Sequence, residues 1–302
     1  MDFGKLQDIS SVDFTLPPNH PDTLPLLQQS GSYIKPSVYI GLPVWVNKAW
    51  VGDIYPSSMR EKDSLLWYGK QFSTIELNST HYHIPSPDTI DRWRQTVPQG
   101  FTFCPKFPQL ISHEAALRST QDITAAFCGA IAGLEDKLGN AFLQLSPSFS
   151  PRQLPDLEIF LQFIPESIPI TVELRHPAWF ADSGASRELF EVLEKHKAGT
   201  VLTDVAGRRD VLHMRLTTPS AMVRFVGNGL HPTDYTRIDA WVERLQQWFD
   251  HGLRQLYFFV HEPDNVLAPE LATYLIQQLN KVCGFDLKPP KKYVQPVQGE
   301  LF

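Results

Sequence analysis

The feature that most constrains the fold of this chain is a series of short apolar segments, each ending in a polar or charged residue. At least six such segments follow one another, and two further apolar runs, 38–41 and 256–262, raise the number to about eight. Eight parallel strands close a barrel with an outer ring of helices, a TIM-type (β/α)8 barrel, whose active-site rim is formed by the carboxyl ends of the strands. The polar ends here are Glu76 with Asn78, Lys106, Gln144, Glu173 with Arg175 and His176, Asp204, and Arg224 with Asn228.

Length and composition agree with a single domain of this type. The chain has 302 residues, and about 250 is typical of such a barrel. Hydrophobic residues make up 42% and charged residues 20%, which is ordinary for a globular protein and argues against a disordered or fibrous chain. The formal charge of -6 argues against a surface that attracts nucleic acid everywhere. It is still compatible with a local basic region at the mouth of the barrel, where the strands end.

The pattern along the chain predicts three regions. Residues 1–35 contain LPPNHPDTLP, which is too rich in proline for a regular element, and we expect them to lie as an arm over the barrel. From 36 to 284, strand-like and helix-like patterns alternate, as in a parallel sheet with crossover helices. Residues 285–302 begin with prolines and lysines that predict an extended tail.

The cysteines and the apolar segments predict a cytoplasmic protein. Cys104, Cys128 and Cys283 lie far apart without metal-ligand spacing, so we expect reduced thiols. No run approaches the ~20 apolar residues of a membrane span, and the first residues do not resemble a signal peptide. We therefore expect no membrane contact.

Longer motifs around the strand ends carry a family resemblance. They are GLPVWVNKAWVGDIYP, IELNSTHYHIPSPDTIDRW, FCPKFPQLISH, LGNAFLQLSPSF and VELRHPAWF. Together, over roughly 38–279, they resemble the YecE-like family, known as domain of unknown function 72. The resemblance implies a TIM-type barrel of unassigned activity. The chain departs from the family pattern at Leu42, Pro43 and Val44, where Thr-Ser-Gly is common, and at His81, where Phe is common.

The first two constellations at the strand ends predict acid–base chemistry. Glu76 and Asn78 are two positions apart on a strand and would present a carboxylate and an amide on the same side. Glu173 and Arg175 would present a carboxylate and a guanidinium on the same side in the same way. His176, held extended by the following proline, is a candidate general acid or base because its ordinary pKa is ~6.5. We predict Glu76, Glu173 and His176 as catalytic residues. The alternative is that Glu76 is buried and paired with a cation, and that His176 caps a loop.

A second set of residues is predicted to bind the substrate. Cationic and amide groups suit a carboxylate or phosphate, and aromatic side chains in the loops suit stacking on a sugar or base. A ring of ion pairs would look the same in sequence. The predicted substrate-binding residues are Trp45, Asn78, Tyr82, Lys106, His113, Gln144, Arg175, Asp204, Arg224 and Asn228.

The same mouth offers metal-ligand types without a diagnostic spacing. Lys106 and Arg175 would repel a cation, so we predict no cofactor and keep a divalent metal as the open alternative. The residues of ligand type are Glu76, His113, Glu173, His176, Asp204, His261 and Glu262.

The last five residues, QGELF, resemble the peptide by which bacterial replication and repair proteins dock on the sliding DNA clamp. That peptide has a glutamine, two variable positions, a leucine and a phenylalanine. A flexible strand with two apolar anchors fits a preformed pocket, so Gln298, Leu301 and Phe302 are predicted to bind a partner. The alternative is that Leu301 and Phe302 pack on the barrel.

Three functions are compatible with these patterns. The first is a barrel enzyme that uses acid–base chemistry on a small polar or anionic, sugar-like or phosphate-like substrate. The second is a nucleic-acid-processing hydrolase recruited to the sliding clamp. The third is a non-catalytic ligand-binding barrel whose charged rim is a set of saturated ion pairs, and it predicts a closed mouth.

Overall fold

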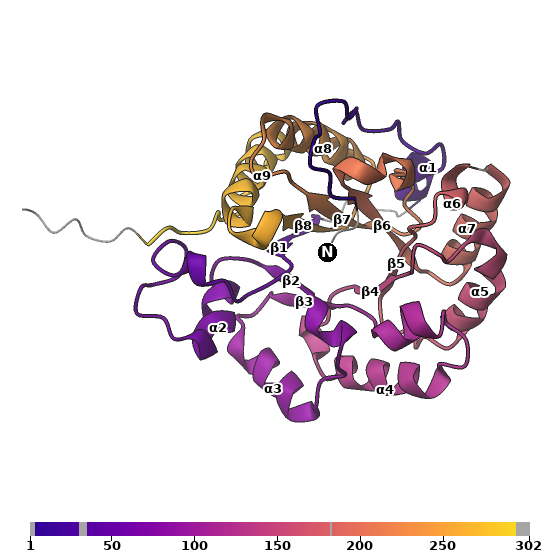
Figure 1. Cartoon of the computed structure of the whole chain (residues 1–302), viewed down its shortest axis with the longest axis horizontal. Helices are drawn as coiled ribbons and strands as arrows, with labels where there is room; N and C mark the ends of the chain where they lie inside the picture. Colours follow the sequence, from indigo (N-terminus) through magenta and orange to yellow (C-terminus); the bar gives the residue numbers. More distant parts are fainter. Residues whose placement is uncertain (1–3, 30–34, 182, 294–302) are drawn as a thin grey trace, which may run out of the picture.

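The computed structural model describes residues 4–29, 35–181 and 183–293. Eight parallel strands are neighbours in the order β3-β2-β1-β8-β7-β6-β5-β4, and helices surround them (Figure 1). The two ends of this order meet where Phe107 N donates to Phe142 O at 3.0 Å, which nearly closes the ring. The predicted TIM-type barrel is confirmed.

The strands are short and regularly spaced along the chain. Each is followed by a helix or a helical turn on its way to the next strand, which is the connection that a parallel pair requires. Their bounds are β1 Ser37–Leu42, β2 Thr74–Leu77, β3 Thr102–Pro105, β4 Ala141–Gln144, β5 Ile170–Glu173, β6 Gly199–Asp204, β7 Ser220–Val226 and β8 Gln255–His261.

The helices begin and end where local signals place them. At the start of α3, Ser86 Oγ accepts from Thr89 N and proline occupies the first turn. α9 ends at Gly284, whose φ of 71° favours glycine. The bounds are α1 Thr23–Gln28, α2 Ser64–Gly69, α3 Pro87–Thr96, α4 Gln121–Ala132, α5 Leu154–Gln162, α6 Ala178–Ala181, α7 Ser183–Lys195, α8 Pro232–Asp250 and α9 Ala268–Cys283.

The N-terminal arm contains a helix that the sequence did not predict. The expectation that residues 1–35 hold no regular element is wrong for α1, because its Pro25 falls in the first turn, where a missing N–H is tolerated. The arm runs along α8 (Figure 1), where Arg244 Nη1 donates to Pro17 O at 2.9 Å. Trp248 Nε1 donates to Asn19 Oδ1, also at 2.9 Å.

The chain after α9 stays on the barrel as far as it is described. Lys291 N donates to Gln71 Oε1 at 2.7 Å, and Tyr293 packs edge-on against Trp67. The predicted partner-binding residues Gln298, Leu301 and Phe302 lie outside the described residues. Within the described ranges, no helix combines the length and the apolar character needed to cross a membrane.

The inside of the barrel and the space between strands and helices hold separate apolar clusters. The larger cluster lies between the strands and the surrounding helices. The smaller one fills the barrel interior and contains one of the three cysteines, all of which are free thiols as predicted. The residues of the interior cluster are Cys104, Phe142, Val201, Met222, Tyr257 and Phe259.

Candidate functional site

The polar strand ends form a layer next to the apolar interior. Side chains alternate along a strand, so a residue two positions after an interior residue also faces the interior. All but the histidine of this layer are at most 4% exposed. On six strands the interior residues are Thr74, Cys104, Phe142, Thr171, Met222 and Phe259. The layer consists of the residues two positions after them, which are Glu76, Lys106, Gln144, Glu173, Arg224 and His261.

The centre of this layer is an ion-pair network that joins β2, β5 and β7. Arg224 donates from Nε and Nη2 to the two carboxylate oxygens of Glu76, both at 2.8 Å. Its Nη1 donates to Oε2 of Glu173 at 3.0 Å. A bidentate pair fixes the orientation of both groups. A buried charge without its partner would be strongly destabilising, so the three side chains hold one another in place.

Glu173 extends this network toward β3 and β4. Arg175 Nε donates to its Oε1 at 2.8 Å, and Gln144 Nε2 donates to its Oε2 at 2.8 Å. Lys106 Nζ in turn donates to Oε1 of Gln144 at 2.8 Å. The contacts therefore run without a break from the guanidinium on β7 to an ammonium group just past the end of β3.

His261 forms the opposite branch of the network. Its Nε2 lies 2.9 Å from Oε2 of Glu76, whose Oε1 accepts from Asn78 Nδ2, also at 2.9 Å. An ionised carboxylate can only accept, so the neutral imidazole donates from Nε2 and keeps its lone pair on Nδ1. No hydrogen bond to a described residue uses this Nδ1. His261 thus has the tautomer and the carboxylate partner of a histidine general base.

Both network glutamates are ionised in the folded protein. Burial would raise the pKa of Glu76, but the charge of Arg224 and the hydrogen bonds from His261 and Arg224 outweigh it and hold the pKa well below its usual range. Burial would raise the pKa of Glu173 as well, and Arg175 and Arg224 outweigh it and lower the pKa to about 2. Such carboxylates are weak proton acceptors and suit positioning better than proton transfer near neutral pH.

Lys106 differs from the other network residues because its hydrogen-bond partner is neutral. The residue is 4% exposed, and its ammonium group can donate three hydrogen bonds. Among the described residues it makes one, to Gln144. Burial, and then the charge of Arg224, lower the pKa of Lys106 to about 8. A lysine in this state can hold an anion or exchange a proton near neutral pH.

Two histidines pack together next to this ammonium group. The ring centroids of His81 and His113 are 5.3 Å apart. Nδ1 of His81 lies 2.7 Å from Phe107 O, so this nitrogen carries the hydrogen. Nδ1 of His113 lies 2.8 Å from Ser112 Oγ, whose own hydrogen goes to Pro108 O, so it also donates. Both neutral rings therefore keep a lone pair on Nε2.

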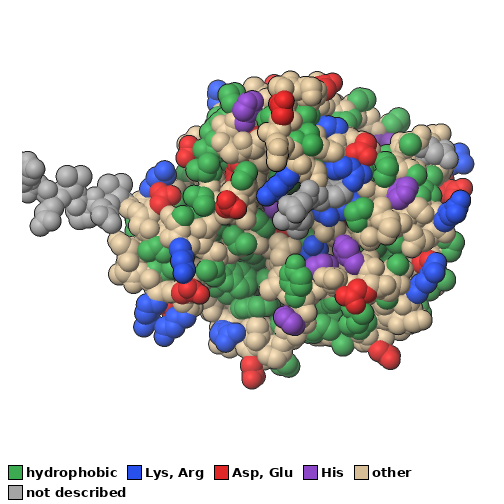
Figure 2. Space-filling model, in the orientation of Figure 1, with side chains coloured by type: hydrophobic (Ala, Val, Ile, Leu, Met, Phe, Trp, Pro, Cys, Tyr) green, Lys and Arg blue, Asp and Glu red, His purple; other side chains and the backbone are tan. Residues whose placement is uncertain are grey.

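We call Lys106, His81 and His113 the lysine corner. Burial, followed by the charge of Lys106, lowers the pKa of His81 to about 4 and also lowers that of His113. The corner therefore contains an ammonium donor beside two imidazoles that are neutral at pH 7. On the face of the barrel that carries the loops after the strands, basic and histidine side chains gather near the centre (Figure 2).

The other predicted binding residues near the mouth line its edges. Trp45 borders a cavity of about 210 Å³ that also reaches Glu76 and Asn78. Tyr82 is 68% exposed, and its ring contacts His81 edge-on. Trp45 therefore lies beside the β2 strand end, and Tyr82 follows the turn after it.

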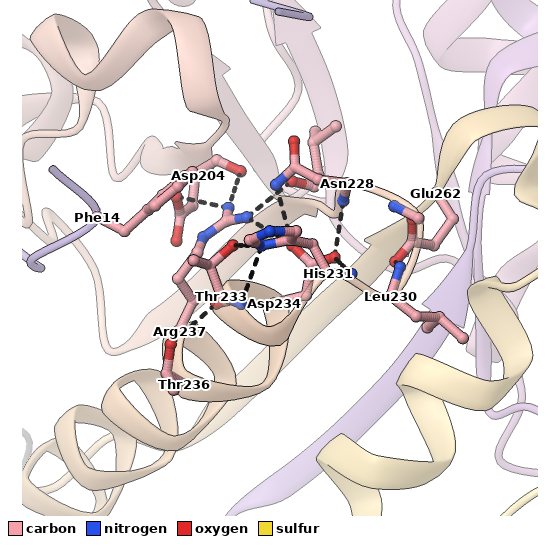
Figure 3. A network of polar contacts seen from close by, with 12 residues as sticks. Phe14, Asp204, Asn228, Leu230, His231, Thr233, Asp234, Thr236, Arg237 and Glu262 are labelled. Carbon is pink, nitrogen blue, oxygen red and sulfur yellow. Dashed lines mark hydrogen bonds and ion pairs between the residues drawn. The ribbon is translucent and has the colours of Figure 1, made fainter. Parts of the chain in front are cut away.

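Asp204 and Asn228 are not brought into the network. Val201 faces the interior, so Asp204, three positions later, faces the helices, where Arg237 Nη2 donates to it at 2.8 Å (Figure 3). Asn228 Nδ2 donates to Asp234 at 3.0 Å. Both side chains fasten strand ends to α8.

His176, the third predicted catalytic residue, binds the backbone just after it. Its Nδ1 accepts from Ala178 N at 3.1 Å and so holds the loop between β5 and α6, as in the alternative interpretation that His176 caps a loop. Within the described part of the chain, no group of three histidine, cysteine, aspartate or glutamate side chains could hold a metal ion.

Two residues of the site, His261 and His81, were not among the predicted site residues. His261 could have been predicted from the motif LYFFVHE, because it stands two positions after Phe259 and alternate residues of a strand face the same side. His81 reaches Lys106 through the turn 78–81 that follows β2. No periodic pattern in the sequence encodes that turn.

Comparison with known proteins gives matches over most of the chain. The family model described as "Protein of unknown function DUF72" matches residues 39–293. The UPF0759 protein YecE of Escherichia coli strain K12 is 34% identical over 262 residues, which cover 81% of this chain and 93% of that protein. The protein of that name from Escherichia coli O157:H7 gives the same values.

A solved structure supports the fold. The crystal structure of a DUF72 family protein from Enterococcus faecalis V583 aligns with a TM-score of 0.65 at 18% identity. The alignment covers 83% of this chain and 98% of that chain. At this identity the likeness concerns the barrel and carries no activity to the present chain.

Proposed function

We propose a function for this chain from the premise that it belongs to the DUF72 family of proteins of unknown function. The proposal is an enzyme that uses acid–base chemistry on a small polar or anionic substrate at the C-terminal mouth of the barrel. The observation that carries it is the pair of His261 and Glu76, with Nε2 and Oε2 2.9 Å apart.

In this proposal His261 moves the proton and Glu76 positions it. The side chain of His261 is 13% exposed and that of Glu76 is 0% exposed, so a substrate can reach the imidazole and not the carboxylate. Arg224 and Asn78 prevent Glu76 from rotating. The fixed carboxylate keeps the hydrogen on Nε2 and stabilises the imidazolium that forms when Nδ1 accepts a proton.

The remaining network residues act as a scaffold and as binding groups. Glu173 orients Arg175 directly and Lys106 through Gln144. The two cations suit the negative charge of a substrate, and proton transfer by an imidazole requires no cofactor. We assign His176 no proton transfer in this scheme.

Hydrogen exchange into candidate substrates tests the proposal whatever the net reaction is. The wild type is incubated in D2O with a panel of hydroxy and keto compounds, with and without phosphate groups, and C–H signals are followed by proton NMR. Exchange should fall about 10²-fold or more in H261N, as for the loss of a general base. H83N, at an exposed histidine, is the control. Equal exchange rates in wild type and H261N would remove His261 from the reaction.

Glu76 is tested as a positioning residue by its effect on pH dependence. E76Q keeps the size of the side chain and removes the charge that stabilises the imidazolium. The pH at which exchange is half-maximal should fall, because the protonated imidazole loses its neighbouring negative charge. A lower rate with an unchanged pH profile would point to a structural role alone.

A non-catalytic ligand-binding barrel is the second candidate. The observation that favours it is that all four carboxylate oxygens of Glu76 and Glu173 accept hydrogen bonds from side chains. This function predicts ligand binding with no exchange in the wild type. Binding without exchange over the whole panel would replace the enzyme by this candidate.

Recruitment to the sliding DNA clamp is a separate proposal about a partner. It is motivated by Gln298, Leu301 and Phe302 in the sequence. Surface plasmon resonance with a purified bacterial clamp should give binding by the full chain and a loss of signal in the double variant L301A/F302A. Equal signals from both proteins would withdraw clamp binding, and with it the nucleic-acid-processing hydrolase.

A further inference from the structure

The lysine corner has unfilled hydrogen-bond donors. Lys106 is 4% exposed, and Gln144 is its single acceptor among the described residues. The neighbouring carboxylate of Glu173 already accepts from Arg175, Arg224 and Gln144. A buried ammonium with unused N–H groups is unfavourable, so an oxygen-rich ligand at this position would stabilise the folded site.

The same corner has unfilled acceptors. Nε2 of His81 and Nε2 of His113 hold lone pairs, because each ring donates its hydrogen from Nδ1. No hydrogen bond to a described residue uses either Nε2. The groups that face the corner and act on its charge come from four strand ends, β2, β3, β5 and β7, and they are Glu76, Lys106, Glu173, Arg175 and Arg224.

A ligand that fits must therefore both accept and donate within a small volume. A carboxylate and a sulfate accept hydrogen bonds but have no hydrogen to donate near neutral pH. A phosphate monoester has a second pKa of ~6, so its monoprotonated form offers oxygens and one hydroxyl in a single tetrahedral group. A phosphodiester, as in a nucleic-acid backbone, lacks that hydroxyl.

We infer that the lysine corner binds the phosphate group of a small monoester substrate in its monoprotonated form, with Lys106 donating to its oxygens and Nε2 of His81 or of His113 accepting the single hydrogen of its hydroxyl. This inference rests on the proposed function, because it names the substrate class of the same mouth. It also states a proton linkage. Above the second pKa of the phosphate, binding takes up a proton, since the bound form is monoprotonated.

Calorimetric titration with inorganic phosphate, a small sugar phosphate and sulfate tests the inference. At pH 7.5 phosphate should bind roughly tenfold or more tightly than sulfate, since sulfate leaves the imidazole lone pairs without a donor. Repeating the titration in two buffers of different ionisation enthalpy should show uptake of up to about one proton. The sugar phosphate should bind at least as tightly as phosphate, and tighter inorganic phosphate would identify the free ion as the ligand instead.

Variants assign the effect to the corner. K106M should weaken phosphate binding roughly tenfold or more. H81F and H113F keep an aromatic ring and should reduce the preference for phosphate over sulfate, while H83F, at an exposed neighbour, should not. If K106M does not fold, the two histidine variants still decide the matter. Equal affinities for phosphate and sulfate in the wild type, or no phosphate binding at all, would overturn the inference.

The outcome is separable from that of the proposed function. H261N should bind phosphate like the wild type, because His261 lies on the other branch of the network. One possible result is that the protein prefers phosphate to sulfate but shows no exchange that depends on His261. This result would contradict the proposed enzyme and support the phosphate-binding site. Exchange that depends on His261 but occurs on compounds without phosphate, together with no selectivity, would remove the binding site alone.

Discussion

The lysine corner and the residues around Asp204 both place a buried cation at the strand ends but differ in whether that cation is paired with a carboxylate. We call Asp204, Asp234 and Arg237 the Asp204 network. Arg237 donates to Asp204 at 2.8 Å and to Asp234 at 3.3 Å, and the network joins β6 to α8 (Figure 3). In the lysine corner the cation meets a neutral amide, and the Nε2 lone pairs of two imidazoles have no donor among the described residues.

This difference separates a structural role from a binding role. Where a buried cation is paired with carboxylates, removal of one partner leaves a buried charge without that partner and lowers the stability of the fold. Where hydrogen-bonding capacity is left open, removal of the group relieves a cost in the free protein and is felt only when a ligand is present. The two regions should therefore respond in opposite ways to the loss of a cation.

The largest effect is expected when the Asp204 network is broken. R237M leaves the buried carboxylates of Asp204 and Asp234 facing an apolar side chain. The free energy of unfolding should fall by about 3–5 kcal/mol, as for the removal of one partner from a buried ion pair. Urea unfolding followed by circular dichroism measures it.

The control for this variant is an exposed arginine. Arg187, whose side chain is 73% exposed, can be changed to Met with an expected change within about 0.5 kcal/mol. A loss below about 1 kcal/mol for R237M would mean that the ion pairs of the Asp204 network add little, and the contrast with the lysine corner would disappear.

Glu262, at the edge of the Asp204 network, predicts a pH effect of intermediate size. It is 4% exposed. Burial raises its pKa from 4.5 to about 7, although the N–H of Gly229 opposes the shift and Asp234 adds to it. The protonated form is thus favoured in the folded protein. This contribution to stability is complete below about pH 4.5 and is lost as the pH rises through 7.

E262Q should remove this pH dependence. Gln cannot ionise and one of its atoms can still accept from Gly229 N, as Oε2 does at 2.7 Å in the wild type. The stability of E262Q relative to wild type should therefore increase by about 2–3 kcal/mol between pH 4.5 and pH 8. Urea unfolding at a series of pH values measures the difference. Parallel curves for the two proteins would show that Glu262 is ionised throughout this range in the folded state.

A smaller effect is expected from the contact between the arm and the Asp204 network. The ring of Phe14 lies 4.8 Å from the guanidinium carbon of Arg237, a distance at which the cation and the ring attract each other. F14A should lower the free energy of unfolding by about 1 kcal/mol beyond the loss of packing, whereas F14L keeps most of the packing. If F14L is as stable as the wild type, the cation contributes nothing measurable.

The two regions also show how far the sequence predicts this site. Alternation along the strands is enough to place Glu76, Glu173 and Arg224 on the interior face, because each stands two positions after an interior residue. The same rule turns Asp204 away from the interior, because it stands three positions after the interior residue Val201. The sequence alone does not show which residues of that strand face the interior.

Partners were harder to predict than positions. Arg224 and Glu76 are 148 residues apart, and several cations of the mouth could have paired with this glutamate by charge alone. Closure of the barrel selects Arg224 because β2 and β7 approach across its interior. His81 depends on a single turn after β2, and α1 depends on the position of one proline, so neither follows from periodicity.

The smallest effect on stability is expected from the change with the largest effect on binding. K106M removes a buried ammonium whose acceptor is the neutral Gln144 and replaces it with an apolar side chain of similar length. The cost of burying the charge disappears, so the free energy of unfolding without ligand should change by less than about 1 kcal/mol, or rise. Thermal unfolding with and without phosphate measures both properties of one protein.

In the wild type, phosphate should raise the melting temperature, because a ligand that binds only the folded state stabilises it. In K106M the rise should be clearly smaller at the same phosphate concentration, although the starting stability is kept. K106R, which retains the charge, is the matched control and should keep part of the rise. A loss of several kcal/mol in ligand-free K106M would place Lys106 with Arg237 among the ion pairs that hold the barrel together. Removal of a buried cation destabilises the ligand-free protein that strongly only where the cation is paired with an anion.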